Sequence, residues 1–221
     1  MQREIITTAD GSTTIQITDW DEQYHSKHGA IQEAYHVFIA SGLSLFSDQE
    51  LSILEIGFGT GLNALITYLE APKLGLNVDY VGVEAYPVKS EELRQLNYIS
   101  ELKAQAFSKD YHLMHDSPWE KEVAISDRFT LHKQQKDFAE LEIQNLFNLI
   151  YFDAFGARVQ PELWTKAIFA SMFRALKNNG ILVTYAAKGS VRRAMQAVGF
   201  YVERLPGPPG KREMLRATKK V

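Results

Sequence analysis

The 221-residue sequence contains no cysteine, which excludes disulfide bonds and thiolate metal sites. No apolar run approaches the roughly 18 residues that a membrane-spanning helix needs. The first residues, MQREIITTADGSTTIQ, are polar and lack the apolar core of an export signal. His112 and His115 are spaced like two metal ligands, but no third ligand accompanies them. These absences favour a cytoplasmic protein with neither a membrane anchor nor a metal.

A large excess of one charge is also missing, since the formal net charge at pH 7 is only −3. The charge is unevenly distributed, however. Residues 150–221 contain 13 Lys and Arg against 4 Asp and Glu, whereas residues 1–149 contain 11 against 23. Such asymmetry indicates a polyanionic partner, although basic helices that merely face solvent would give the same counts.

Apolar segments of strand length alternate with helical segments from residue 52 onward. Strands are expected in SILEIG, VDYVGVEA, FTLHKQ, FNLIYFDAF and GILVTYA, and helices over residues 61–70, 87–99, 161–180 and 189–200. Residues 100–127 predict helical or irregular structure, and the last two segments, YVERLP and REMLRATK, predict a closing hairpin. Two short strands around Asp10-Gly11 and a helix near GAIQEAYHVFIASGL precede this pattern. The alternation predicts an α/β fold with a doubly wound, mostly parallel sheet.

The stretch LEIGFGTG predicts a strand that runs into a nucleotide-binding turn. Gly57, Gly59 and Gly61 form G-x-G-x-G, but Leu62 stands where the dinucleotide-binding fingerprint has its third glycine. Glu55 places a carboxylate at the strand end, which suits a cationic ligand better than a diphosphate. S-adenosylmethionine carries a sulfonium and an ammonium group, so this turn favours S-adenosylmethionine over NAD. A dehydrogenase remains an alternative that Glu55 and Leu62 disfavour.

Acidic residues also follow the later strands, where ligands bind in such sheets. Glu84 can accept hydrogen bonds from ribose hydroxyls, a device shared by NAD enzymes. Asp137 either contacts the adenine amino group or caps the helix that follows it. Asp153, at the end of LIYFD, can position or deprotonate a nucleophilic amine, and Phe155 can pack on a flat base. Asp-Ala-Phe lies where amino-methylating enzymes have Asp/Asn-Pro-Pro-Tyr.

Several motifs in the same order carry a family resemblance. YHSKHGAIQEAYHVFIASGL, GFGTGLN, GVEAYP, YFDAF with PELW, and GKREML together resemble the methyltransferase half of the bifunctional tRNA wobble-uridine enzyme MnmC, over about residues 20–220. The resemblance implies a Rossmann-like class I methyltransferase with a mostly parallel seven-stranded sheet and a C-terminal antiparallel hairpin. Residues 1–50 would supply N-terminal strands and a cofactor-covering helix, and residues 51–221 the methyltransferase domain.

The resemblance also implies an activity and a set of site residues. The activity is methyl transfer from S-adenosylmethionine to the primary amine of 5-aminomethyl-2-thiouridine in tRNA, with Asp153 and Phe155 at the reacting amine. The cofactor-binding residues would be Tyr24, Ser26, Glu55, Gly57, Gly59, Gly61, Asn63, Glu84, Asp137 and Asp153, with Gly29 helping to close the pocket. The RNA-binding residues would be Lys188, Arg192, Arg193, Lys211 and Arg212.

Two departures from the family pattern shape these expectations. The sequence has no counterpart of the FAD-dependent oxidase half, so we expect a separate oxidase to supply the aminomethyl group. DAFGAR replaces the more usual D-A-F-A-P, which predicts a looser loop after Asp153.

Two alternatives remain open. One is a small-molecule amine methyltransferase or an aminopropyltransferase, and the other is a non-catalytic module that binds S-adenosylmethionine or RNA.

Overall fold

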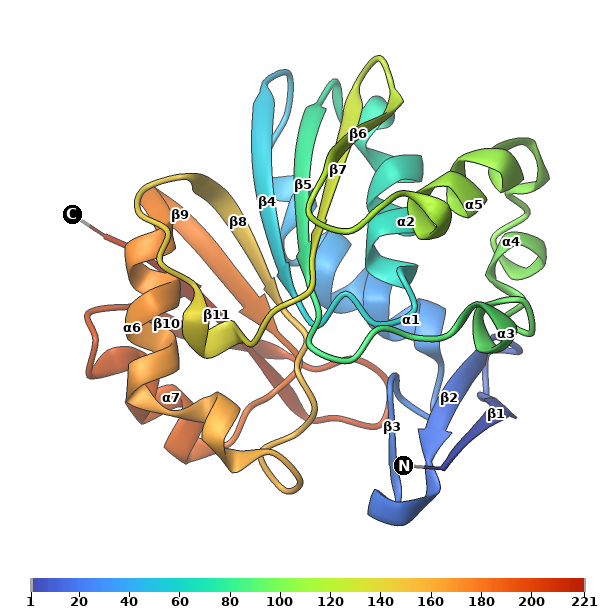
Figure 1. The fold of residues 1–221 in the computed structure, drawn as a ribbon. Helices are drawn as coiled ribbons and strands as arrows, with labels where there is room; N and C mark the ends of the chain where they lie inside the picture. The colour runs from blue at the N-terminus through green and yellow to red at the C-terminus, as the bar shows by residue number, and fades with distance from the viewer. Residues whose placement is uncertain (1, 221) are drawn as a thin grey trace.

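A computed structural model describes residues 2–220, and a central twisted sheet organises this part of the chain (Figure 1). Its parallel strands are β4 (Glu50–Ile56), β5 (Asn77–Val83), β7 (Phe129–Gln134), β8 (Phe147–Phe152) and β9 (Leu176–Thr184). Its antiparallel strands are β6 (Glu122–Ser126), β10 (Tyr201–Pro206) and β11 (Glu213–Thr218). Across residues 2–220 the strand order is β10-β11-β9-β8-β4-β5-β7-β6.

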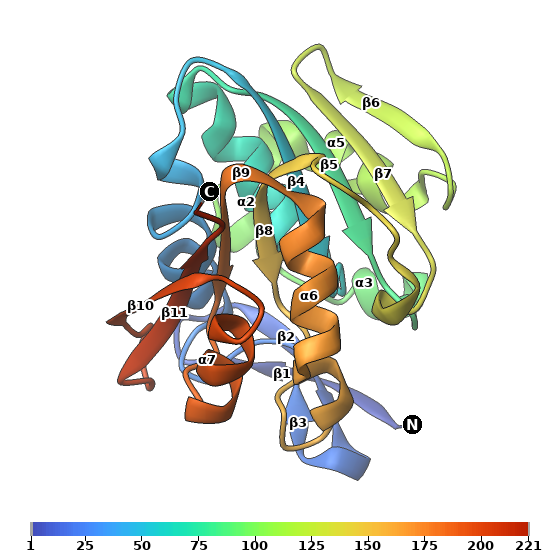
Figure 2. The same cartoon turned by 90° about the vertical axis from the view of Figure 1, so that its left-hand side faces the viewer.

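Helices cover both faces of the parallel strands. On one face, α1 (Ala30–Ala34), α2 (Leu62–Glu70) and α5 (Ser108–Asp116) pack against side chains such as Leu51 and Ile53. On the other, α6 (Lys166–Ala175) and α7 (Gly189–Gln196) pack against Leu54 and Ile56 (Figure 2). Neighbouring residues of β4 are therefore buried on opposite faces, as expected for an inner parallel strand. Two short helices, α3 (Ser90–Leu93) and α4 (Tyr98–Glu101), follow β5.

The N-terminal residues form a second, smaller sheet from β1 (Arg3–Thr7), β2 (Thr13–Ile17) and β3 (Glu22–Gln23). This sheet lies at the end of the molecule toward which the parallel strands point (Figures 1 and 2). The chain then passes through α1 into a π-helical segment, Tyr35–Ala40, whose Val37 and Phe38 join the same core as Leu51. The N-terminal segment is thus attached to the main core and also reaches the edge of the sheet where ligands bind in such folds.

The predicted α/β architecture with a closing antiparallel hairpin is confirmed, with corrections. Between residues 2 and 220 the sheet has eight strands rather than seven, because β6 forms an antiparallel edge strand where helical or irregular structure was expected. The single helix expected over residues 87–99 is two short helices, α3 and α4.

The helix expected to run to Gly180 ends at Ala175. Leu176 is fully buried and pairs with Phe147 as the first residue of β9. The register of β9 then shifts, because residues 177–180 bulge from the strand with Asn179 at a φ of +62°. The polar Asn-Gly pair that suggested a helix end is therefore part of a strand irregularity.

The strand order reverses between the neighbouring strands β4 and β8. The strands β4, β5 and β7 run outward to one side, whereas β8 and β9 run outward to the other. In such folds the crevice beyond the carboxyl ends of these two strands is the usual ligand site. Here the backbone N–H of Asp153 donates to the carbonyl of Ile56 at 2.9 Å, so Gly57 and Asp153 meet at that point.

Candidate active site

A cavity of about 240 Å³ opens beyond the carboxyl ends of β4, β5 and β8. Most of the residues that the sequence predicts for the cofactor or the reacting amine line it: Tyr24, Gly57, Gly59, Asn63, Glu84, Asp137, Asp153 and Phe155. They come from the N-terminal segment and from the loops after four strands. The fold therefore brings together side chains that are far apart in the sequence.

The glycine loop is shaped by conformations that suit residues without a side chain. Gly57 has a φ of +89° and Gly59 a φ of +49°. A Cβ atom on Gly57 would lie 2.6 Å from the carbonyl oxygen of Asp153, and one on Gly59 would lie 3.1 Å from the Tyr24 ring. Both glycines thus leave bare backbone on the cavity wall.

Three predicted cofactor residues lie behind the cavity wall instead of on it. Glu55 is fully buried and accepts hydrogen bonds from Asn63 Nδ2 at 2.9 Å and Tyr80 Oη at 2.8 Å, and its burial raises its pKa well above the usual range. Gly61 faces His115. The backbone N–H of Ser26 donates to a Glu33 carboxylate oxygen at 2.9 Å. The sequence predicts that Glu55 faces a cationic ligand, whereas in the structure Glu55 lies beneath Asn63.

Glu84 is held by the backbone of two loops. One carboxylate oxygen accepts from the Gly59 N–H at 3.0 Å and the other from the Tyr86 N–H at 2.9 Å. Burial raises the pKa of Glu84, and these hydrogen bonds and the charge of Arg3 oppose that rise. Asp137 lies on the wall nearby and also caps the short helix that follows, since it accepts from the Ala139 N–H at 2.9 Å.

Asp153 is fixed from below by Asn63. The amide nitrogen of Asn63 donates to Asp153 Oδ2 and to Glu55 Oε1, both at 2.9 Å. Burial, and secondly the charge of Glu33, raise the pKa of Asp153 to about 7, although the Asn63 hydrogen bond and Lys211 lower it. A carboxyl with this pKa on a cavity wall can exchange a proton at neutral pH.

An aromatic cluster forms the wall beside Asp153. The ring of Phe155 makes T-shaped contacts with Trp20, with centroids 5.8 Å apart, and with Tyr24, with centroids 4.9 Å apart. All three side chains line the cavity. The cluster joins the loop after β8 to the N-terminal segment, and it offers apolar ring surface to a flat ligand.

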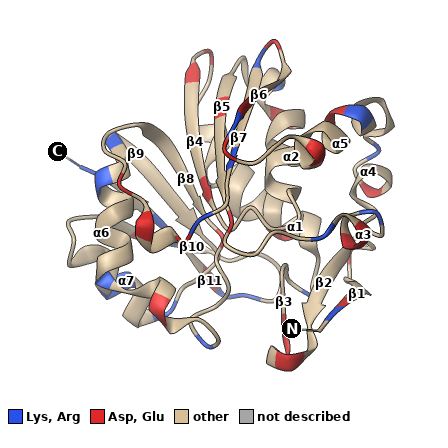
Figure 3. Cartoon of the chain, in the orientation of Figure 1, with Lys and Arg blue, Asp and Glu red and all other residues tan. Residues whose placement is uncertain are grey.

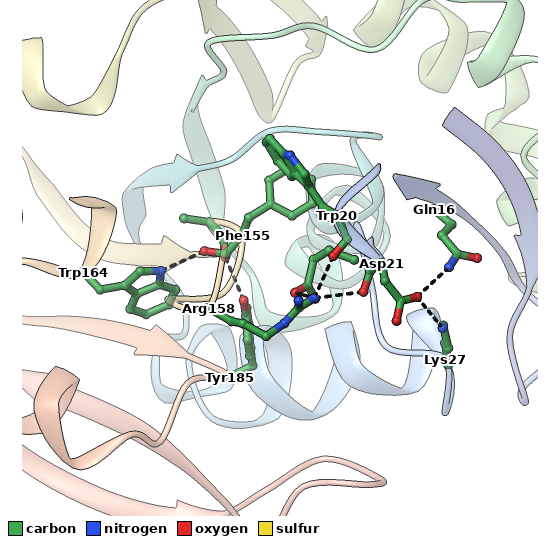
Figure 4. Close-up of polar contacts among 10 residues, drawn as sticks. Gln16, Trp20, Asp21, Lys27, Phe155, Arg158, Trp164 and Tyr185 are labelled. Atoms are coloured by element: carbon green, nitrogen blue, oxygen red, sulfur yellow. Dashed lines mark hydrogen bonds and ion pairs between the residues drawn. The ribbon is translucent and has the colours of Figure 1, made fainter. Parts of the chain in front are cut away.

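The loop after Asp153 is firmly held, contrary to the looseness expected from DAFGAR. Tyr185 Oη donates to the carbonyl of Ala154 and Trp164 Nε1 to that of Phe155, both at 2.8 Å (Figure 4). Arg158 Nη2 donates to the carbonyls of Trp20 and Asp21 at 3.0 and 2.9 Å (Figure 4), and it also pairs with Glu22 at 2.9 Å. Arg158 thus ties this loop to the N-terminal segment.

The predicted RNA-binding residues separate into different environments. Lys188, Lys211 and Arg212 line a second depression, here called the basic groove, which also includes Arg158 and shares Tyr185 with the cavity. Its residues are Gly156, Ala157, Arg158, Tyr185, Ala186, Ala187, Lys188, Val191, Lys211, Arg212 and Glu213. Arg192 and Arg193 lie on α7 outside this lining, although Figure 3 shows basic residues on α7.

The sequence predicted no role for Arg3, Trp20, Tyr185 and Glu33, and it predicted RNA binding for Lys211. Arg3, Trp20 and Tyr185 line the cavity, and Glu33 and Lys211 form an ion pair beside it. Glu33 and Lys211 stand inside quoted motifs, so their presence there was the available signal. Nothing in the order of the sequence showed that these two residues meet.

Two further observations concern residues 2–220 alone. No group of three or more His, Asp or Glu residues in this range is arranged to hold a metal ion. None of its helices combines the length and the apolar character that crossing a bilayer requires.

Comparisons with known proteins agree with this geometry. The sequence model of the S-adenosyl-L-methionine-dependent methyltransferase family matches residues 99–220. The tRNA 5-methylaminomethyl-2-thiouridine biosynthesis bifunctional protein MnmC of Idiomarina loihiensis is 30% identical over 216 residues, which cover 90% of this chain and 36% of that protein. The MnmC of Aromatoleum aromaticum is 33% identical over 203 residues, which cover 87% of this chain and 32% of that protein. This chain therefore spans about a third of the length of these curated relatives.

Solved structures show the same similarity. The crystal structure of MNMC2 from Aquifex aeolicus has a TM-score of 0.79 and 25% identity, and the match covers 100% of this chain and 71% of that one. Spermidine synthase from Thermotoga maritima has a TM-score of 0.53 with 12% identity, covering 100% of this chain and 73% of that one, which shows the fold alone. The resemblance to the methyltransferase half of MnmC that the motifs predicted is confirmed.

Proposed function

Because this chain belongs to the S-adenosyl-L-methionine-dependent methyltransferase family, we propose that it methylates the primary amine of 5-aminomethyl-2-thiouridine at the wobble position of tRNA. The observation that carries the proposal is Asp153, a carboxyl on the cavity wall with a pKa of about 7, flanked by the Phe155 aromatic cluster. The names of the similar proteins contain 5-methylaminomethyl-2-thiouridine, the nucleoside that this methylation would produce.

The free space at the glycine loop and the carboxylates of the cavity suit S-adenosylmethionine. The bare backbone of Gly57 and Gly59 leaves space that a Cβ would fill, and the carboxylates of Glu84, Asp137 and Asp153 favour a cationic ligand. We assign Glu84 to the ribose hydroxyls and Asp137 to the adenine side. When bound, the cofactor supplies an electrophilic methyl group. Glu55, Gly61 and Ser26 would then support the wall from behind, and Asn63 would hold Asp153.

Asp153 has a defined task in this proposal. An aminomethyl group is mostly protonated at neutral pH, so its nitrogen must lose a proton before its lone pair can react. Asp153 Oδ2 is fixed by Asn63, which leaves the other carboxylate oxygen to accept that proton. The Phe155 cluster orients the uridine ring and thereby aligns the amine with the methyl group. This alignment supplies a large part of the rate enhancement.

The first experiment incubates the purified protein with S-adenosylmethionine and tRNA that carries 5-aminomethyl-2-thiouridine, followed by digestion and mass measurement of the nucleosides. We expect a gain of one methyl group on that nucleoside. Free aminomethyl nucleoside and polyamines serve as competing acceptors. If methyl transfer occurs on a small amine and not on tRNA, the tRNA assignment is wrong while the methyltransferase remains.

We also propose that the basic groove contacts the RNA backbone, with Lys188 and Arg212 as its phosphate ligands. Arg192 and Arg193 on the neighbouring α7 would extend this surface. Lys211 is already paired with Glu33, and Arg158 with Glu22, so these two cations are less available to phosphate. Aromatic side chains in the adjoining cavity suit a base that is turned out of its stack.

Lys188→Ala and Arg212→Ala each weaken tRNA binding and reduce the slope of log Kd against log salt by about 1, as expected for one lost phosphate contact. Filter binding over a salt series measures this. Lys109→Ala, on α5 across the sheet, is the control and should leave the slope unchanged. An unchanged slope in both groove variants would show that the basic groove does not contact the RNA phosphates.

Arg158→Ala weakens S-adenosylmethionine binding because the loop after Asp153 loses its attachment to Trp20 and Asp21. We expect a loss of about 1 kcal/mol of binding free energy, which corresponds to a roughly fivefold higher Kd. Isothermal titration calorimetry measures it, with Arg174→Ala on α6 as the control, since the Arg174 guanidinium donates to Ser171 Oγ of its own helix at 2.8 Å. Equal affinity of the Arg158 variant and the wild type would contradict the role given to this loop.

Three coarser expectations complete the proposal. We divide the chain near residue 50, with residues 1–50 covering the cofactor and residues 51–221 forming the methyltransferase domain. An oxidase activity would supply the aminomethyl group, because the relatives named MnmC are described as bifunctional. A cytoplasmic location follows from the tRNA substrate.

A further inference from the structure

Glu33 and Lys211 form an ion pair beside the cavity, although the sequence predicted RNA binding for Lys211 and no role for Glu33. Glu33 lies on α1, and Lys211 lies in the turn between β10 and β11. Lys211 Nζ is 2.5 Å from Glu33 Oε1, and the two side chains are 33% and 9% exposed. The other Glu33 oxygen accepts from the Ser26 N–H at 2.9 Å. Glu33 is therefore largely removed from water while Lys211 stays a third exposed, and charge–charge interactions in such a partly buried pair are stronger than those in bulk water.

The lysine also reaches the loop that carries Asp153. Its ammonium lies 3.8 Å from the centroid of the Tyr185 ring, a cation–π contact. Tyr185 Oη in turn donates to the carbonyl of Ala154 at 2.8 Å (Figure 4). A chain of contacts thus runs from Glu33 through Lys211 and Tyr185 to the residue next to Asp153.

We propose that Glu33 and Lys211 are a positioning pair for the reaction: Lys211 holds Tyr185 against the Asp153–Ala154 backbone, and the two charges together set the proton affinity of the Asp153 carboxyl. This inference rests on the proposed function, because it assigns these residues to the proton transfer at Asp153. Neither residue needs to touch the substrate. Lys211, predicted to bind RNA, is thereby reassigned to the protein's own site.

The surroundings of Asp153 allow the two charges to be separated by experiment. The titratable, charged or hydrogen-bonding groups that face it come from α1, α2, β4, β5, the end of β9 and the β10–β11 turn: Glu33, Asn63, Glu55, Tyr80, Tyr185 and Lys211. Glu33 raises the pKa of Asp153 and Lys211 lowers it. Removing one partner leaves the other uncompensated, so the two single substitutions act in opposite directions.

The test is a carboxyl ¹³C NMR titration of cofactor-free protein labelled at aspartate, with Asp153→Asn to assign the resonance. Glu33→Gln shifts the Asp153 titration midpoint downward by about 1 pH unit, and Lys211→Met shifts it upward by a similar amount. Lys211→Arg retains the positive charge, so its Asp153 titration midpoint stays at the wild-type value. The double variant Glu33→Gln/Lys211→Met lies between the two single variants. Shifts in the same direction, or no shift in either, would overturn the proposal.

Two further measurements keep the outcome interpretable. Circular dichroism melting identifies a variant that fails to fold, and Glu33→Asp replaces Glu33→Gln in that case, with a smaller downward shift expected because the charge remains. The titration needs neither tRNA nor methyl transfer, so it can succeed where the tRNA assignment fails. Where methyl transfer is observed, the pH–rate midpoints of the variants follow the order of the NMR midpoints. An order that differs would show that the pair does not act through Asp153.

Discussion

Asp153→Asn lowers the rate of methyl transfer by a factor of about 10²–10⁴, the usual contribution of a positioned proton acceptor. The amide is nearly the same size and still offers an oxygen to Asn63, so the cavity keeps its shape while the proton acceptor is lost. In the wild type, kcat rises as the pH increases through about 7, because only the ionised carboxylate accepts a proton. The variant lacks this rise.

Single-turnover assays from pH 5.5 to 9 measure the loss, and equilibrium binding of S-adenosylmethionine is the control. Binding should persist, because Gly57, Gly59 and Glu84 are untouched. Wild-type activity in the variant would show that the amine loses its proton to water, with Asp153 uninvolved. A complete loss of cofactor binding would instead assign Asp153 to the cofactor rather than to the amine.

The same substitution should stabilise the protein at high pH. The pKa of Asp153 is about 7 in the folded protein, against an ordinary value of 3.8. The ionised carboxylate therefore destabilises the fold fully above pH 7, and this penalty vanishes as the pH falls below 3.8. Asparagine carries no such charge. The Tm of Asp153→Asn should exceed that of the wild type at pH 8, and the difference should shrink toward pH 4.

Gly57→Ala disrupts the cofactor pocket and the fold around it. A left-handed φ of +89° is costly for alanine, and the new Cβ would lie 2.6 Å from the carbonyl oxygen of Asp153. Unfavourable backbone conformations of this kind cost about 1–3 kcal/mol. Relief of the contact would push the loop away from β8, so S-adenosylmethionine affinity should fall by about 5- to 160-fold, the equivalent of ~1–3 kcal/mol.

Gly156→Ala is the matched control, since it is also a glycine beside the site. A Cβ there meets only Tyr185 Oη at 3.7 Å, an ordinary contact distance. Thermal melting and calorimetric titration of both variants separate strain from a general effect of alanine. If the two variants melt alike and bind S-adenosylmethionine alike, the glycine loop does not require its left-handed conformation.

The sequence could predict those features of the site that follow directly from a strand. Gly57, Glu84 and Asp153 each come within a residue of a strand end, so a correct strand assignment also places them at the ligand-binding edge. Glu55 shows the limit of this reasoning. It is the penultimate residue of β4, and whether it faced the ligand or the interior depended on Asn63 and Tyr80, which the strand pattern does not specify.

Long-range contacts account for the rest of what was missed. The segment DAFGAR predicted a loose loop, but its Arg158 bonds residues near position 20, which are 136 to 138 positions earlier in the chain. The local composition of Asn179-Gly180 suggested a helix end, whereas the pairing of Leu176 with Phe147 makes it a bulge. In each case the deciding partner was remote in sequence, where periodicity and spacing carry no information.

The contact between the N-terminal segment and the last hairpin affects the order in which the protein folds and becomes able to bind its cofactor. Glu33 and Lys211 are separated by 178 positions, and His36 bonds the carbonyl of Pro206 across 170. Pairings this distant generally form late in folding. On the ribosome, the glycine loop, Glu84 and Asp153 emerge well before Lys211. We therefore expect cofactor binding to lag behind helix formation in stopped-flow refolding, so that affinity for the methyl donor reports that folding is complete.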